Sequence, residues 1–140
     1  MTDKSISELE NWKWEDEIPT RETHSGTECR FYELHNVSLL KLDLLDIRFL
    51  IGQNAGLKYL VPDTIDELRD DIFKEAEYYQ GDLLCALFLI NDEPNYWKTH
   101  TKEKQQLIDI YQDQKRNLGT IEDEEIIQKI KEAYEDFLTK

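Results

Sequence analysis

The sequence predicts an all-α protein, a compact single-domain bundle of five or six helices. Apolar residues recur every three or four positions in several segments, which is the pattern of a helix with one buried face. No segment requires a strand, and no internal repeat or low-complexity linker divides the chain. With 140 residues, the chain is long enough to bury a hydrophobic core as one domain, residues 1–140.

Residues 1–27 are polar and form a predicted N-terminal strap, with a turn at Pro19. Trp12 and Trp14 lie within the strap, next to an acidic run at residues 15–17. Tryptophan in such a place either packs back onto the domain or anchors a recognition surface, where this residue type is enriched. We favour the packed strap and keep the recognition surface as the alternative.

The segments that follow the strap are short. The composition of residues 23–27 predicts a loop. Residues 29–34 favour a short helix, and residues 37–42 are apolar but too few to distinguish a helix from a strand. Asp43 is the expected N-cap of the first clear helix, which ends near Gln53. We interpret the amide of Gln53 as a buried group that ties two helices together.

Three further helices are expected in the middle of the chain. One runs from residue 57 to about residue 71, and Pro62 predicts a kink or a restart there because proline has no amide hydrogen to donate. Asp82 follows a glycine and is the expected cap of a nearly all-apolar helix. Pro94 fits the first turn of the next helix, which ends at residues 117–119.

The last helix has the clearest pattern. Thr120 is its expected cap, and residues 120–139 form an amphipathic helix at the C-terminus. Its apolar face comprises Ile126, Ile127, Ile130, Ala133, Tyr134, Phe137 and Leu138. In the preceding helix, Trp97 shares a stripe with apolar residues and is interpreted as part of the core.

The net charge of −14 restricts the possible partners. Nucleic acid and anionic membranes are disfavoured as direct ligands, because binding to phosphate groups requires clustered Lys and Arg. A basic protein would be attracted instead. The chain lacks a membrane-length apolar run and a signal-peptide pattern, and Cys29 and Cys85 show no disulfide framework. We therefore expect a cytoplasmic protein.

The patterns of common catalytic and metal sites are missing from the sequence. The three histidines lie far apart, and there is no Glu-x-x-His or Cys-x-x-Cys pair. There is also no Gly-x-Ser-x-Gly, no P-loop and no Gly-x-Gly-x-x-Gly. We accordingly predict no catalytic residue, no metal and no cofactor, and a binding protein rather than an enzyme.

Several short motifs in one order resemble a known family. They are Leu-Asp-Ile-Arg-Phe-Leu-Ile-Gly-Gln at 45–53, Gly-Leu-Lys-Tyr-Leu-Val-Pro at 56–62, Tyr-Gln-Gly-Asp-Leu-Leu at 79–84, and Tyr-Trp at 96–97. Together they make residues 39–112 similar to the immunity proteins of bacterial contact-dependent growth inhibition (CDI) systems. The second motif of that family usually carries proline where Lys58 stands here.

The resemblance implies a cytosolic immunity protein that binds and neutralises the C-terminal toxin domain of its cognate CDI protein, which is commonly a basic nuclease. The expected toxin contacts are acidic and aromatic residues in two surfaces. The first comprises Asp66, Asp70, Asp71, Glu75, Glu77, Tyr78 and Tyr79, on and after the helix that starts at residue 57. The second comprises Trp12, Trp14, Glu15, Asp16 and Glu17.

Two other functions remain open at this stage. One is an acidic regulatory protein that imitates nucleic acid and blocks some other DNA- or RNA-binding protein. The other is a small enzyme with a carboxylate site that carries no recognisable motif. The first predicts several partners, and the second predicts a pocket of carboxylates.

Overall fold

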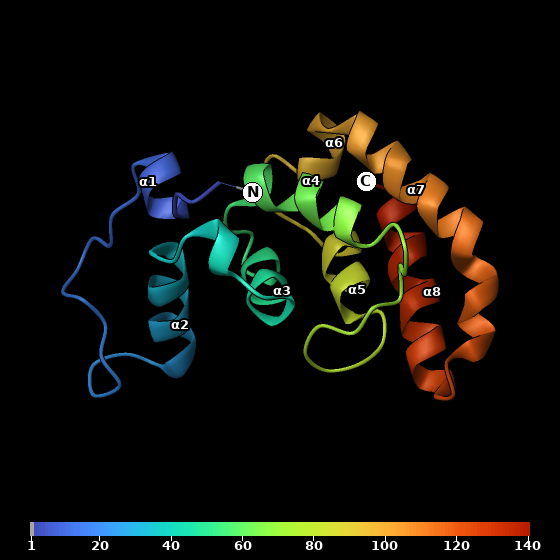
Figure 1. Cartoon of the computed structure of the whole chain (residues 1–140), viewed down its shortest axis with the longest axis horizontal. Helices are drawn as coiled ribbons and strands as arrows, with labels where there is room; N and C mark the ends of the chain where they lie inside the picture. The colour runs from blue at the N-terminus through green and yellow to red at the C-terminus, as the bar shows by residue number, and fades with distance from the viewer. Residues whose placement is uncertain (1) are drawn as a thin grey trace. The chain divides into compact units, whose positions relative to one another are not determined.

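A computed structural model describes residues 2–140. These residues form eight α-helices and two short 3-10 helices and contain no strand, so the all-α prediction is confirmed and the predicted number of helices is too low (Figure 1). The elements are α1 (Ile6–Glu10), α2 (Gly26–His35), η1 (Leu39–Lys41), α3 (Leu44–Gly52), α4 (Leu57–Glu67), α5 (Asp82–Phe88), α6 (Tyr96–Thr99), α7 (Thr101–Gln114), η2 (Lys115–Thr120) and α8 (Glu124–Leu138).

The chain divides into two compact units. The first ends at Asp46, and the second runs from Ile47 to Lys140, so the boundary lies inside α3. The first unit contains α1, α2 and η1, and the second contains the elements from α4 to α8. The organisation as a single domain stays a prediction.

Two capping boxes begin the helices of the first unit. The Ser5 hydroxyl accepts a hydrogen bond from the Glu8 amide at 3.2 Å, and the Glu8 carboxylate accepts one from the Ser5 amide at 3.1 Å. Ser25 and Glu28 make the same pair of bonds at α2. These bonds satisfy amides that lack partners in the first turn of a helix. As a result, a helix lies within the predicted polar strap, and the loop predicted at 23–27 is wrong from Gly26 onward.

The ambiguous segment at 37–42 contains the 3-10 helix η1. The Leu39 amide donates to the Lys4 carbonyl at 3.0 Å, and Ser5 and Ser38 form an isolated antiparallel bridge. Leu39 is buried. Lys4 and Ser5 are therefore held by backbone pairing beside η1.

The helices α3 and α4 confirm some details of the prediction and correct others. Asp43 caps α3 as expected, with its carboxylate accepting from the Asp46 amide at 2.9 Å. The helix α4 continues through Pro62 without a restart. Burial of several apolar side chains on one face, each contributing roughly 1.5–3 kcal/mol, offsets the roughly 3 kcal/mol that an internal proline costs. Gln53 is exposed, so its interpretation as a buried amide is wrong.

Aromatic rings fill the core of the second unit, where α8 packs against α5 (Figure 1). The ring centroids of Phe88 and Phe137 are 4.8 Å apart, and those of Trp97 and Phe137 are 5.0 Å apart. Trp97 is fully buried, and its indole nitrogen donates to the Leu87 carbonyl at 2.8 Å. The interpretation of Trp97 as a core residue is confirmed.

The C-terminal helices begin later than expected. Pro94 precedes α6, whose N-cap is Asn95, and the single helix predicted there divides into α6 and α7 at His100. Asp123 rather than Thr120 caps α8, because its carboxylate accepts from the Glu125 amide at 2.9 Å. Of the predicted apolar face of α8, four residues are buried and Leu138 is exposed.

Gly81 allows α5 and α8 to approach closely. It precedes α5 with φ of +88°, and a Cβ atom built there would lie 2.6 Å from the Ile130 side chain of α8. Both the backbone conformation and the contact exclude a side chain.

We expect Gly81→Ala to lower the free energy of unfolding by roughly 2–4 kcal/mol, since it adds backbone strain and a steric clash. Urea denaturation would measure the loss. Gly52→Ala is the control, because nothing lies within 4 Å of its Cβ position and the helix α3 tolerates alanine. Equal stability of Gly81→Ala and the wild type would contradict this account of the packing.

Candidate functional site

The first predicted surface, here called the acidic segment, covers residues 66–79. Asp66 lies in the last turn of α4, whereas the other members follow in the connection between α4 and α5. The prediction that Asp70 and Asp71 lie on a helix is therefore wrong, because α4 ends at Glu67. The exposed members are Asp66, Asp70, Asp71, Glu75 and Tyr78, and the half-buried ones are Glu77 and Tyr79.

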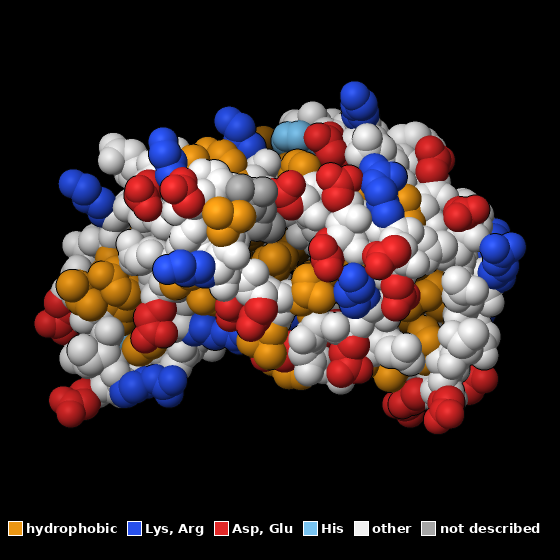
Figure 2. Space-filling model, in the orientation of Figure 1, with side chains coloured by type: hydrophobic (Ala, Val, Ile, Leu, Met, Phe, Trp, Pro, Cys, Tyr) orange, Lys and Arg blue, Asp and Glu red, His pale blue; other side chains and the backbone are white. Residues whose placement is uncertain are grey.

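Two basic residues partly neutralise this surface. The guanidinium of Arg69 lies 3.0 Å from Asp66, and the Lys74 ammonium lies 3.1 Å from Glu67 and 3.7 Å from Asp70. Ion pairs this exposed contribute little to stability, about 0–1 kcal/mol each. The surface keeps a net negative charge, and Figure 2 shows acidic and basic side chains interspersed on the face in view.

Asp82 holds the connection in its shape. The residue is 1% exposed, and its side chain accepts hydrogen bonds from the amides of Ala76 at 2.7 Å, Glu77 at 2.8 Å and Tyr78 at 2.8 Å. The predicted role as a helix cap is wrong, because the carboxylate is directed back to the preceding segment and Gly81 is the N-cap. Asp82 thus fixes the backbone of the acidic segment at its C-terminal end.

Arg48 of α3 faces the same carboxylate, and the sequence analysis did not identify it. Its Nε atom is 3.8 Å from an Asp82 oxygen, and its guanidinium carbon is 4.7 Å from the centre of the Tyr78 ring. A buried carboxylate requires such compensation, because removal of its charge from water costs several kcal/mol. The available signal was the single basic residue of a mostly apolar helix.

The second predicted surface lies in the first unit and packs against α2. Trp12 stacks on His35 with 4.1 Å between ring centroids and meets Phe31 edge-on. Trp14 makes an edge contact with Tyr32 at 6.0 Å. Both indoles are half-buried, which is what the packed-strap interpretation expects, and each keeps some exposed surface.

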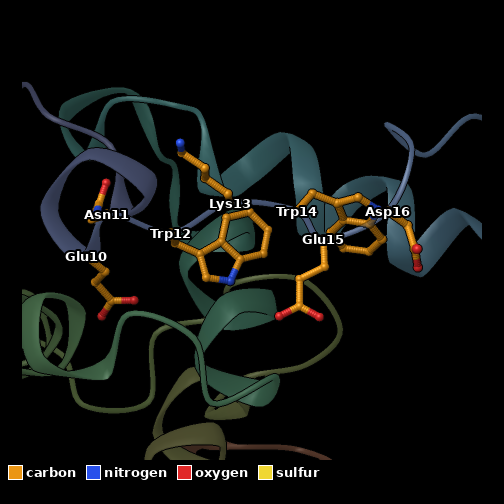
Figure 3. A pocket seen from close by; sticks show the side chains of 7 residues that line it. All are labelled: Glu10, Asn11, Trp12, Lys13, Trp14, Glu15 and Asp16. Atoms are coloured by element: carbon orange, nitrogen blue, oxygen red, sulfur yellow. The ribbon is translucent and has the colours of Figure 1, made fainter.

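A hollow of about 550 Å³ opens on this strap (Figure 3). It is lined by Glu10, Asn11, Trp12, Lys13, Trp14, Glu15 and Asp16. Figure 3 shows the carboxylates of Glu10 and Glu15 on the same side of the segment as the Trp12 indole, with Lys13 directed the opposite way. The structure thus brings four of the five predicted strap residues together, and Glu17 is exposed outside the lining. Glu10, Asn11 and Lys13 were not predicted.

The surroundings of His35 keep its ring neutral. Burial lowers the pKa of this imidazole, and hydrogen bonding to the Phe31 carbonyl and the charge of Glu10 oppose that shift only in part. The Nδ1–H group donates to the Phe31 carbonyl at 2.7 Å. The ring stacked on Trp12 is therefore uncharged at neutral pH.

Other chemistry has little support among residues 2–140. No group of three His, Cys, Asp or Glu side chains in this range could hold a metal ion. Cys29 and Cys85 are free and buried, and burial raises the pKa of the Cys85 thiol to about 11. No helix in the described part of the chain has the length and apolar character needed to cross a membrane.

Comparison with protein families gives a match. The family model of the CDI immunity proteins matches residues 8–107, which include both predicted surfaces. The chain belongs to this family. Comparisons with curated proteins and with solved structures found no match. In this CDI immunity protein the match begins within α1 and ends within α7, so η2 and α8 lie outside it.

We expect Asp82→Ala to destabilise the immunity protein by roughly 3–5 kcal/mol, because it leaves Arg48 and three amides without their common partner. Hydrogen exchange should show faster exchange at Ala76, Glu77 and Tyr78. Asp71→Ala is the matched control, since this exposed carboxylate accepts only one amide bond in the same connection, from Phe73. Unchanged exchange in a folded Asp82→Asn variant would contradict the role of Asp82.

The lowered pKa of His35 predicts a pH dependence. The folded state resists protonation, so the unfolded state binds more protons below the ordinary value of 6.5. The contribution of His35 to stability is therefore complete above pH 6.5 and decreases as the pH falls towards the folded pKa. An NMR titration of the His35 ring should give a midpoint below 6.5, and a midpoint at or above 6.5 would refute the prediction.

Proposed function

We propose that this protein binds and neutralises the C-terminal toxin domain of its cognate CDI protein in the cytoplasm. The membership in the CDI immunity family carries this proposal. The acidic segment is the proposed main contact surface, and the strap residues Trp12, Trp14, Glu15, Asp16 and Glu17 form a second one.

The charge of the chain supports a basic toxin, and a nuclease in particular. A nuclease holds the phosphate backbone of its substrate with clustered Lys and Arg. The whole chain has a net charge of −14, so its acidic surface attracts such a groove and can compete with nucleic acid for it. Blocking the groove would stop the enzyme through binding alone.

The acidic segment is suited to binding because its backbone is already ordered. The amides of Glu77 and Tyr78 are fixed by Asp82, so less conformational entropy is lost when a partner binds. Tyr78 is 64% exposed and presents an aromatic ring beside the carboxylates. Aromatic residues of this kind are typical anchors in protein interfaces.

We expect Asp70→Lys with Asp71→Lys to weaken toxin binding at least about tenfold, because two attractive charges become repulsive. Isothermal titration calorimetry at two salt concentrations, with the toxin domain encoded beside this gene, would measure it. The affinity of the wild-type protein should fall as the salt concentration rises, and the affinity of the variant should fall less.

Glu93→Lys with Asp109→Lys is the matched control, because it changes the total charge equally at exposed positions of the second unit outside residues 66–79. Equal weakening by both pairs would contradict a defined acidic interface. Absence of binding by the wild-type protein would contradict the proposed function itself.

A further inference from the structure

We propose that the hollow on the strap receives an arginine side chain of the bound partner. The inference rests on the proposed function, because it names the chemical group that the partner inserts at the second surface. The hollow combines aromatic walls with carboxylates, and these are the two features that a guanidinium group recognises.

The charge of the lining selects a cation. Three acidic residues, Glu10, Glu15 and Asp16, line the hollow together with one basic residue, Lys13. Lys13 is directed away from the side on which Glu10 and Glu15 lie (Figure 3). An anion would be repelled there, and an apolar side chain would remove water from carboxylates without pairing them, which is unfavourable.

The tryptophans supply the surface on which a guanidinium can stack. Cation–π contacts are strongest with Trp and more often involve Arg than Lys. Trp12 is fixed by its stack on His35, and the neutral imidazole adds no positive charge that would oppose a cation. The indole is thus oriented before any partner arrives, which lowers the entropic cost of binding.

Two further observations fit a side chain that arrives on a peptide backbone. A volume of about 550 Å³ is within the usual range of ligand pockets, so a whole side chain can enter with some water. Hydrophobic side chains also gather at the surface over the segment between α1 and α2 (Figure 2).

The test uses the tripeptide acetyl-Gly-Arg-Gly-amide and the full-length protein. In ¹H–¹⁵N NMR spectra, the indole signals of Trp12 and Trp14 should shift on titration, whereas that of the fully buried Trp97 should not. The same peptide with citrulline, which has the shape of arginine without its charge, should bind roughly tenfold more weakly. Equal binding of the citrulline peptide, or no shift at Trp12 and Trp14, would overturn the proposal.

Substitutions in the lining provide a second arm. Glu15→Gln with Asp16→Asn should weaken the arginine peptide several-fold, because two of the three carboxylate charges are lost. Glu22→Gln with Glu33→Gln is the matched control, since it removes two exposed carboxylates of the same unit outside the hollow. Equal weakening by both pairs would mean that general charge, rather than the hollow, attracts the peptide.

The outcomes distinguish this inference from the proposed function. Toxin binding without any response to the arginine peptide would leave the immunity function in place and refute the arginine site. A response to the peptide without toxin binding would support the site and refute the proposed function. Toxin binding that is weakened by Glu15→Gln with Asp16→Asn, and not by the control pair, would support both.

Discussion

The carboxylate of Asp82 is the group on which the second unit and its acidic surface both depend. The connection between α4 and α5 has no regular secondary structure, so its amides need partners from elsewhere. Asp82 supplies one carboxylate for three of them, and Arg48 balances the buried charge from α3. Gly81 completes the arrangement, because its positive φ turns the chain at the start of α5 where Ile130 leaves no space for a side chain. The same few residues therefore determine both the packing of the second unit and the shape of its acidic surface.

Elements with a clear periodicity of apolar residues or a local capping residue could be predicted from the sequence. The apolar face of α8 and the Asp43 cap of α3 depend on neighbours within one or two turns, and both are visible in a short window. The helix α1 was missed although Ser5 and Glu8 have the spacing of a capping box. Its five residues make little more than one turn, which is too short for a periodic apolar signal. The break at His100 was missed because the apolar stripe continues across it.

The candidate surfaces were predictable in composition but not in geometry. Acidic residues are seldom buried, so the exposure of Asp70 and Asp71 could be expected from their type. The role of Asp82 could not be expected from its residue type, because its partners lie four to six residues upstream in a segment without periodicity. The hollow also has no sequence signal. It depends on the left-handed conformation of Asn11 and on the stack of Trp12 on His35, which only the folded chain brings together.

Charge and shape contribute differently to recognition by such a protein. A large negative charge accelerates the approach of any basic protein, so it cannot by itself separate a cognate toxin from another basic nuclease. Discrimination requires features that raise the affinity for one partner and lower it for others through unpaired or clashing groups. In the proposed interface, the backbone fixed by Asp82 and the hollow with its oriented indoles would meet this requirement, since neither can adjust without losing buried hydrogen bonds or ring contacts. If these surfaces are the interface, a partner without a matching basic group would bury their carboxylates without pairing them, and the net charge of the chain would not compensate for that loss.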